Sequence, residues 1–251
     1  MTRVRVDLVT TTAAPSRPEM LEPQEFRRWA QLRYLADRDR LFTGVMLRRA
    51  VLGEKAQRSV PVQRRCRGCG AVDHGEVQPE LHDDRTRWRT SLSHSQTEIV
   101  LAVAEAEGAD VHVGVDLEFI ARMNSRMAKH ILSPAERSRI PNPTRRLLCG
   151  IWTAKEATLK ALGCGLHASM LDLEIKWSPQ ARRSVVHSAG ADPRLSALRE
   201  QRSRLFDVTG IISDCHDDDT GRRAALMVIG AEDVRVVHRR LTTDELWAAT
   251  S

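Results

Sequence analysis

The stretch GVDLEFI, residues 114–120, places two carboxylates, Asp116 and Glu118, two positions apart inside an apolar run. Apolar side chains alternate with other residues over 111–118, which predicts a β-strand because successive strand side chains point to opposite faces. Both acids then share one face, with attachment points about 7 Å apart. Unpaired charges are costly inside a strand, so the pattern indicates that these acids have a partner.

A helix is predicted after this strand, over about residues 142–165, with Asn142 as its cap and glycines at its end. Within it Trp152, Glu156 and Lys160 recur every four residues. Residues at this spacing lie on one face of a helix. A third carboxylate and a lysine therefore share a single stripe.

The rest of the chain indicates an α+β fold with helices and antiparallel hairpins in each half. Residues 20–56 are predicted to be helical, with Gly53 as a plausible end, and residues 99–118 to form a hairpin that turns at 107–110. Further strands are predicted over residues 171–177, 205–213, 224–230 and 234–240. No sequence repeat of solenoid length is present.

Composition bounds the class of protein. The chain has 251 residues, 41% hydrophobic and 29% charged, as in a soluble globular protein. It lacks an apolar run of about 18 residues, and its first residues lack the apolar core of a signal peptide, so a cytoplasmic protein that does not bind membranes is expected. Five cysteines are an odd number, and the cytoplasm is reducing, so a disulfide framework is not expected. The net charge of +6 favours a polyanionic partner.

The three acidic residues Asp116, Glu118 and Glu156 could supply oxygen ligands to a metal ion. Hard oxygen ligands suit Mg²⁺, which keeps several waters and is commonly shared with a phosphate or pyrophosphate. Lys160 would point a positive charge at the same ligand. Alternatively, the two strand acids are solvated at a strand end, and Glu156 with Lys160 is an ordinary exposed pair.

Ser93, His94 and Ser95 precede the predicted hairpin. Neighbours on an extended chain point to opposite sides, so Ser93 and His94 do not form a nucleophile and base, and no G-x-S-x-G motif exists. A hydrolase is therefore the weaker interpretation. The two side chains could instead bind a phosphate or ribose, or only make hydrogen bonds within a loop.

Cys66 and Cys69, with His74 and His82 downstream, could offer four zinc ligands. A single C-x-x-C without a second pair or the usual finger spacing is weak evidence for zinc.

Several motifs together resemble one family. SLSHS at 91–95, VGVDLE at 113–118 and WTAKEATLK at 152–160 occur in the order and at the separations of the Sfp-type 4′-phosphopantetheinyl transferases. The segment CRGCG…HG…QPEL also resembles a loop of that family, and the resemblance covers about residues 20–230. It implies two pseudo-symmetric α+β halves, divided here as 1–112 and 113–251, with coenzyme A in the cleft between them.

The resemblance also implies a reaction. The phosphopantetheine arm of coenzyme A, the co-substrate, would move to a serine of an apo acyl or peptidyl carrier protein of polyketide or nonribosomal peptide biosynthesis, releasing adenosine 3′,5′-bisphosphate. The nucleophile would belong to the partner. Such an enzyme would need Mg²⁺, or alternatively Mn²⁺, and it is expected to be a monomer.

The family's site residues fall on matching positions of this chain. The metal ligands would be Asp116, Glu118 and Glu156, and Glu156 would also take the serine proton. Lys160 and His94 would donate hydrogen bonds to the phosphates, with Ser93 as a further coenzyme A contact. Trp152 and Lys155 are expected to fix the helix.

Two departures affect the coenzyme A side. Gln78 precedes Pro79, where many members have a lysine, so this contact would be weaker and uncharged. The 3′-phosphate would fall to arginines of the first helices, of which Arg40 matches a basic family position best and Arg28 is the other candidate.

The carrier protein is expected to dock after Glu118, where charged and flexible apolar side chains mix. The residues concerned are Arg122, Met123, Arg126, Met127 and Lys129. Alternatively, the two methionines are the buried stripe of a short helix.

Two other classes of function compete. A basic nucleic-acid-binding protein could use the arginines and a zinc site, but four phenylalanines and one tyrosine leave few stacking platforms. A non-catalytic binder of carrier proteins would be expected to lose the acids, and all three are present. Because the stacking platforms are few, no nucleic-acid partner is expected.

Overall fold

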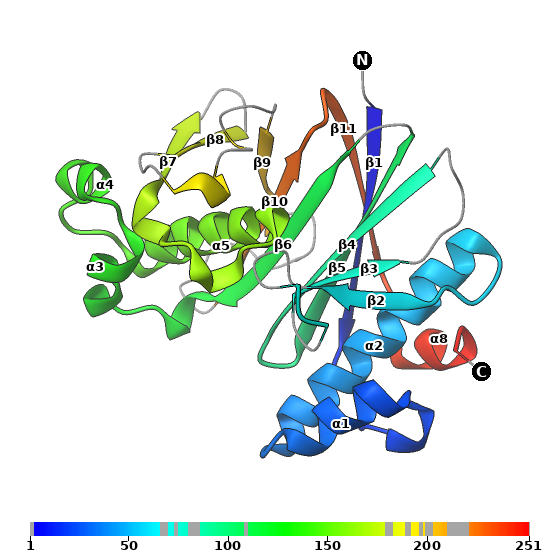
Figure 1. Ribbon diagram of the computed structural model, residues 1–251. Helices are drawn as coiled ribbons and strands as arrows, with labels where there is room; N and C mark the ends of the chain where they lie inside the picture. The colour runs from blue at the N-terminus through cyan, green and yellow to red at the C-terminus, as the bar shows by residue number, and fades with distance from the viewer. Residues whose placement is uncertain are drawn as a thin grey trace.

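The computed structural model describes residues 3–65, 70–72, 75–79, 86–107, 110–178, 183–188, 192–195, 198, 203–209 and 221–250. It is a mixed α/β structure in which a helix packs on each of two β-sheets, as expected (Figure 1). Among the described residues no helix is both long and apolar enough to cross a membrane.

The first sheet has the strand order β11-β1-β5-β4. Its strands are β1 Arg3–Thr12, β4 Thr86–Ser95, β5 Glu98–Glu107 and β11 Asp233–Arg240. One face is covered by α2 Leu35–Ala56, and α1 Pro23–Gln31 and α8 Thr243–Ala248 pack against α2 (Figure 1). The predicted helix 20–56 is thus two helices, and α2 continues past Gly53 to a left-handed Gln57 (φ 52°).

The second sheet is antiparallel, with the order β6-β10-β9-β8-β7. Its strands are β6 His112–Phe119, β7 Leu173–Ser178, β8 Arg183–Ser188, β9 Ser203–Asp207 and β10 Arg222–Ile229. Helix α5, Arg145–Leu162, packs on β6 and β10. Thr144, not Asn142, caps α5 by accepting a hydrogen bond from the Leu147 amide, and the helix ends at Gly163 as expected.

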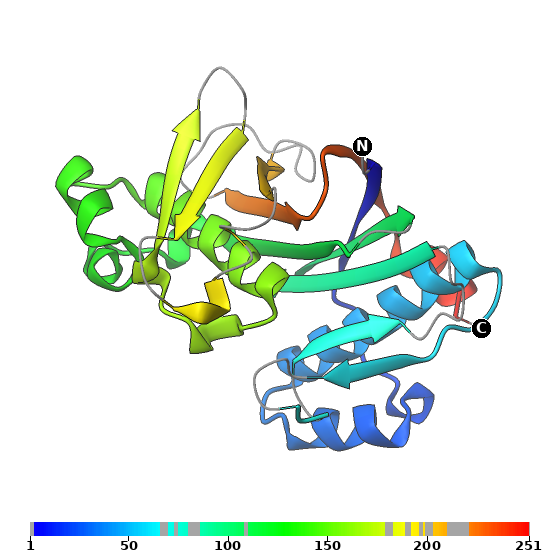
Figure 2. The ribbon, with the colours of Figure 1, turned by 45° about the horizontal axis from the view of Figure 1, so that its top comes forward.

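Shorter elements complete the structure. The strands β2 Val62–Arg65 and β3 Glu76–Pro79 form a small separate sheet over the first helices (Figure 2). The short helices are α3 Ala128–Ile131 and α4 Pro134–Arg139, with single 3₁₀ turns at 18–20, 120–122, 125–127, 165–167, 170–172 and 193–195.

Strand β6 is buried on both faces. Val113, Val115 and Leu117 join an apolar cluster with β1 and β5 of the first sheet, as the predicted alternation requires. The opposite face meets α5 so closely that a Cβ at Gly114 would lie 1.9 Å from the Ala157 carbonyl oxygen. Only glycine fits this contact, and it brings the acidic face of β6 beneath the stripe of α5.

The predicted hairpin over residues 99–118 is wrong. β5 pairs instead with β1 and β4, and β6 pairs with β10 in the other sheet. The local hairpin is β4–β5, because a two-residue turn at Gln96 and Thr97, with Gln96 left-handed (φ 51°), joins them directly.

Strand β1 was not expected from the sequence, although Val4, Val6 and Leu8 alternate in it and are buried. β1 pairs in parallel with β11, near the other end of the chain. The residues from 233 onward therefore lie with the first sheet, whereas the sequence-based division placed all of 113–251 in the second half.

Candidate functional site

A cavity of about 590 Å³ lies where the two sheets meet, lined from α2, β2, β3, β4, β6 and α5. It gathers most of the residues that the sequence singled out: Ser93, His94, Asp116, Glu118, Trp152, Glu156 and Lys160. Arg28, Arg40 and Gln78 are not among its lining residues. The acidic strand face and the helix stripe therefore belong to one site.

Asp116 is the acid of this site that pairs with Lys160. Its side chain is buried, and its Oδ1 accepts hydrogen bonds from Ser93 Oγ at 2.8 Å and from Lys160 Nζ at 2.7 Å. Lys160 also donates to the Val115 carbonyl at 3.1 Å. Lys160 thus reaches across the edge of β6 and neutralises Asp116.

Glu118 lies two residues further along the same strand face. Its Oε1 accepts hydrogen bonds from the Ser95 hydroxyl and from the Phe119 amide. Arg122 makes a longer ion pair with it, at 3.8 Å. Glu118 is therefore held at the edge of β6 by β4 and by the following turn.

Glu156 is buried on α5, and no described group donates a hydrogen bond to its carboxylate. Burial, followed by the negative charge of Asp116, raises the pKa of Glu156 from 4.5 to about 7, against the opposing effect of Lys160. A carboxyl with this pKa can take or give a proton near neutral pH.

The structure does not bring the three acids together as a finished metal centre. Among the described residues no group of three or more His, Cys, Asp or Glu side chains is placed to hold a metal ion. The chemistry nevertheless fits a hard divalent cation, because the charges of Asp116 and Glu156 repel each other across the same cavity. A cation there would relieve that repulsion once Lys160 releases Asp116.

His94 is exposed and lies on the opposite side of β4 from the buried Ser93, as the extended chain requires. Desolvation by its surroundings, and then the charges of Arg40 and Lys160, lower the pKa of His94. The ring therefore stays neutral at physiological pH. It can donate one hydrogen bond to an anionic ligand.

Two arginines that sequence reasoning missed, Arg48 and Arg64, line the cavity. Burial and the charge of Arg28 lower the pKa of Arg48 to about 10 and that of Arg64 to about 9, since Glu25 opposes these effects only in part. The Arg48 Nε has no hydrogen-bond partner among the described residues. This cluster carries excess positive charge toward the cavity, as a site for phosphate groups requires.

Arg40 and Gln78, two of the three residues expected on this side, are engaged elsewhere. Arg40 donates to the Gln96 carbonyl at 2.9 Å and pairs with Asp37. The Gln78 amide lies 3.5 Å from a Glu76 carboxylate oxygen. Arg48 could have been found from the sequence, because it lies eight residues after Arg40 on the same helix, near the same stripe.

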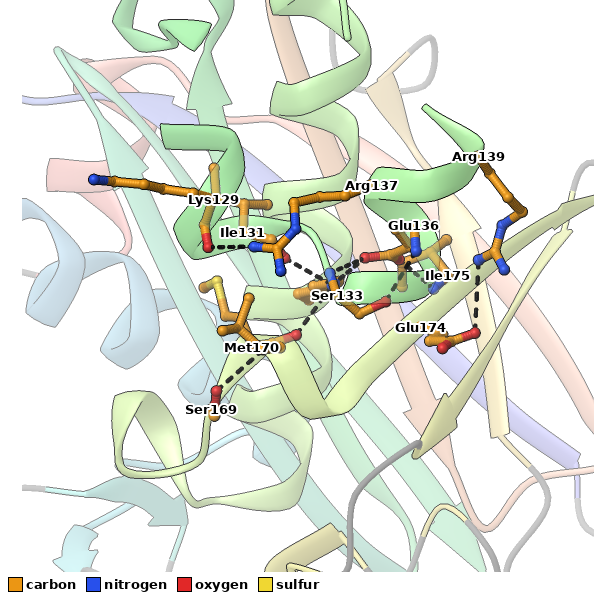
Figure 3. A network of polar contacts seen from close by, with 12 residues as sticks. Lys129, Ile131, Ser133, Glu136, Arg137, Arg139, Ser169, Met170, Glu174 and Ile175 are labelled. Carbon is orange, nitrogen blue, oxygen red and sulfur yellow. Dashed lines mark hydrogen bonds and ion pairs between the residues drawn. The ribbon is translucent and has the colours of Figure 1, made fainter. Parts of the chain in front are cut away.

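Behind the cavity, Lys155 is fully buried and ties α5 to its neighbours, as expected for a residue that fixes the helix. Figure 3 shows Glu136, Ile131 and Met170, which are among these neighbours. The Lys155 Nζ donates to Glu136 Oε2 at 2.5 Å and to the carbonyls of Ile131 and Met170 at 2.8 and 3.0 Å. Glu136 in turn accepts the amide hydrogen of Ile175 at 2.7 Å. Burial lowers the pKa of Lys155.

The segment after Glu118 differs from both of its predicted forms. Met123 is buried and Met127 is half-buried against the same apolar cluster, so they do not form an adaptable surface. Met123 follows one 3₁₀ turn and Met127 ends the next, so they are not the stripe of a single short helix either. Arg122, Arg126 and Lys129 are exposed, and Arg122 reaches Glu118, which lines the cavity.

The predicted zinc ligands, Cys66, Cys69, His74 and His82, lie outside the described residues. The zinc site stays a prediction.

Part of the second half matches a known family. Residues 112–209 match the model of the 4′-phosphopantetheinyl transferase superfamily. The chain is 39% identical over 74 residues to a holo-(acyl-carrier-protein) synthase of Campylobacter jejuni and 40% identical over 72 residues to one of Campylobacter fetus. These alignments cover 26% and 25% of this chain, and it spans only 63% and 61% of those relatives.

Solved structures give similar names. A holo-ACP synthase of Plasmodium yoelii aligns at 21% identity with a TM-score of 0.38, over 51% of this chain and 100% of its own. A holo-(acyl-carrier-protein) synthase of Bacillus anthracis in complex with CoA (3′,5′-ADP) aligns at 19% identity with the same TM-score of 0.38, over 50% and 100%.

Proposed function

We propose that this chain, whose residues 112–209 match the 4′-phosphopantetheinyl transferase superfamily, transfers the phosphopantetheine arm of coenzyme A to a serine of an apo acyl or peptidyl carrier protein. Adenosine 3′,5′-bisphosphate is the other product. The observation that carries the proposal is that a single cavity joins Asp116, Glu156 and Lys160 to the arginines Arg48 and Arg64. This combination suits a ligand with a pyrophosphate and a further phosphate.

The position of the cavity supports the proposed two-part architecture. α2 packs against the first sheet, α5 packs against the second, and the cavity takes residues from both helices. A coenzyme bound there would contact both halves of the molecule.

The basic residues would hold coenzyme A. Arg48 and Arg64, with the charge of Arg28 nearby, suit the 3′-phosphate, and His94 and Lys160 suit the pyrophosphate. Arg64 lies on β2 opposite Val77 of β3, so its side chain is on the other face of this small sheet from Gln78. Arg64 lines the cavity and would supply positive charge there, whereas Gln78 is not among the lining residues.

The acidic residues would serve the transfer itself. Asp116 and Glu156, with Glu118 beside them, would hold Mg²⁺ or Mn²⁺, and this ion when bound neutralises charge on the phosphates. The carrier serine Oγ forms a bond to the phosphorus next to the pantetheine arm, and the bond from that phosphorus to the leaving adenosine bisphosphate breaks. The Glu156 carboxylate would take the serine proton.

The carrier protein would approach the exposed basic edge formed by Arg122, Arg126 and Lys129. Carrier proteins are typically acidic around the modified serine, so opposite charges would steer the encounter. The protein would act as a monomer in the cytoplasm, in polyketide or nonribosomal peptide biosynthesis.

The test is to incubate the protein with coenzyme A, Mg²⁺ and a panel of apo carrier proteins, and to measure carrier mass by mass spectrometry. We expect the mass gain of one phosphopantetheine arm, its loss in EDTA, and its loss in Asp116→Ala. Asp233→Ala is the matched control, because that exposed aspartate lies on β11 and pairs only loosely with Arg3, at 3.8 Å. Normal transfer by folded Asp116→Ala would overturn the metal assignment, and no transfer by wild type to any carrier would overturn the function.

A further inference from the structure

The two large sheets meet along the edge strands β4 and β6, which belong to different sheets. Three alternate serines of β4, Ser91, Ser93 and Ser95, make the polar contacts across this junction, which we call the serine seam. The Val115 amide donates to Ser91 Oγ at 3.1 Å, and the Leu117 amide donates to Ser93 Oγ at 3.2 Å. Hydroxyl oxygens thus accept hydrogen bonds that a neighbouring strand's carbonyls would accept in a continuous sheet.

Two of these serines also contact the candidate metal ligands. Ser93 Oγ donates its proton to Asp116 Oδ1 at 2.8 Å, and Ser95 Oγ donates to Glu118 Oε1. Ser91 contacts the backbone of β6, and no described carboxylate accepts its proton. The seam therefore has two members that touch a carboxylate and one that does not.

The use of the Ser93 hydroxyl argues against its expected role as a direct coenzyme A contact. A serine has one proton to donate, and that of Ser93 is directed at Asp116. Its side chain is also 5% exposed, whereas its neighbour His94 is open to the cavity. A phosphate bound in the cavity would therefore contact His94 and the cationic side chains, and not Ser93.

We infer that Ser93 and Ser95 are positioning residues, which hold the carboxylates of Asp116 and Glu118 at the edge of β6 in the orientation that binds a divalent cation. The inference rests on the proposed function, because that function supplies the reason for a cation. Ser93 on β4 and Lys160 on α5 both donate a hydrogen bond to Asp116 Oδ1. Without the hydroxyls, Asp116 is left to its ion pair with Lys160, and Glu118 is left to the Phe119 amide and the exposed Arg122.

Loss of a group that orients a metal ligand typically weakens metal binding by about 10- to 100-fold. Ser91→Ala is the matched control, since it removes a seam hydroxyl from the same face of the same strand without touching a carboxylate. All three alanine variants lose a contact between the sheets, so all three should lower the melting temperature by similar, small amounts. Only two of them should change cation binding.

The experiment titrates Mn²⁺ into the full chain without coenzyme A or carrier protein, counts free Mn²⁺ by electron paramagnetic resonance, and follows thermal unfolding of each variant by circular dichroism. We expect Ser93→Ala and Ser95→Ala to raise the Kd for Mn²⁺ by about tenfold or more. Ser91→Ala should stay within about twofold of wild type, since it touches no carboxylate.

Wild-type Mn²⁺ affinity in both Ser93→Ala and Ser95→Ala would overturn the inference, and so would an equal loss in Ser91→Ala, which would make the seam purely structural. Absence of Mn²⁺ binding by wild type would overturn it as well. Failure of the proposed function is a separate result, because transfer to carrier proteins is measured in the mass-spectrometric assay. A chain that transfers nothing but loses Mn²⁺ affinity in these two variants keeps the seam and loses the function.

Discussion

Helix α5 carries two lysines five residues apart, and each pairs with a carboxylate from another element. The Lys155 side chain is 0% exposed and pairs with Glu136, 1% exposed, while two backbone carbonyls accept its other protons. Lys160 is 28% exposed and pairs with Asp116 at the wall of the cavity. One pair is closed to solvent and the other is open.

The contrast indicates how the same type of ion pair can hold structure in one place and, in the proposed function, serve chemistry in another. Every donor of Lys155 has a fixed partner, so the pair can only hold α4, α5 and β7 together. Lys160 faces a cavity large enough for a ligand, so it can exchange Asp116 for a phosphate. Access to the ligand, more than the type of residue, separates the two roles.

The largest expected effect comes from breaking the closed pair. Glu136→Ala leaves the Lys155 ammonium buried without its counter-charge, and this should lower the free energy of unfolding by about 3–5 kcal/mol. Urea denaturation measures the loss. The double variant Lys155→Met/Glu136→Leu should recover most of it, because it leaves no buried charge. A Glu136→Ala protein as stable as wild type would mean that this network does not hold the second half together.

Breaking the open pair should act mainly on transfer. It should lower stability less than breaking the closed pair does, because Asp116 keeps its hydrogen bond from Ser93 and lines the cavity. Lys160→Ala removes a donor to the charge that develops on the phosphates, and kcat/KM should fall by about 10²–10³-fold. The mass-spectrometric assay, run with time, gives the rate, and urea denaturation gives the stability. A variant that loses stability as Glu136→Ala does, or keeps its full rate, would remove the distinction between the two lysines.

Glu156, between the two lysines in sequence, sharpens the comparison through pH. Its pKa is about 7 in the folded protein against 4.5 ordinarily, so between these values the folded state holds a proton that the unfolded state has released. Stability should therefore fall as pH rises from 4.5 to 7, by at most about 3 kcal/mol. Glu156→Gln should abolish this loss, gaining stability relative to wild type at pH 8 in EDTA and matching it at pH 4. Parallel pH profiles for both proteins would contradict the raised pKa.

The smallest effect is expected at the exposed cations that follow Glu118. Arg122 is 60% exposed, so its charge is screened and contributes to steering more than to stability. Arg122→Glu and Arg126→Glu should raise the KM for carrier protein about tenfold, less at high salt, without changing the KM for coenzyme A. Arg3→Glu on β1, 85% exposed, is the matched control. Unchanged KM values in both variants would place the docking surface elsewhere.

Local periodicity in the sequence determined the parts of the site that lie on single elements. The alternation over 111–118 placed Asp116 and Glu118 on one face of a strand, and the spacing of Trp152, Glu156 and Lys160 placed them on one stripe of a helix. These patterns follow from the repeat of each element, 2.0 residues in a strand and 3.6 in a helix.

Only the tertiary structure decided which elements meet. In the folded chain β5 pairs with β4 and not with β6, and β11 pairs with β1 although the two strands are near opposite ends of the sequence. Arg48 of α2 and Arg64 of β2 line the same cavity. The tertiary structure also directed the Ser93 and Ser95 hydroxyls at Asp116 and Glu118. The physical reason is that strand pairing and ion pairing depend on contacts between distant residues, and no local repeat of side chains encodes which distant partner is chosen.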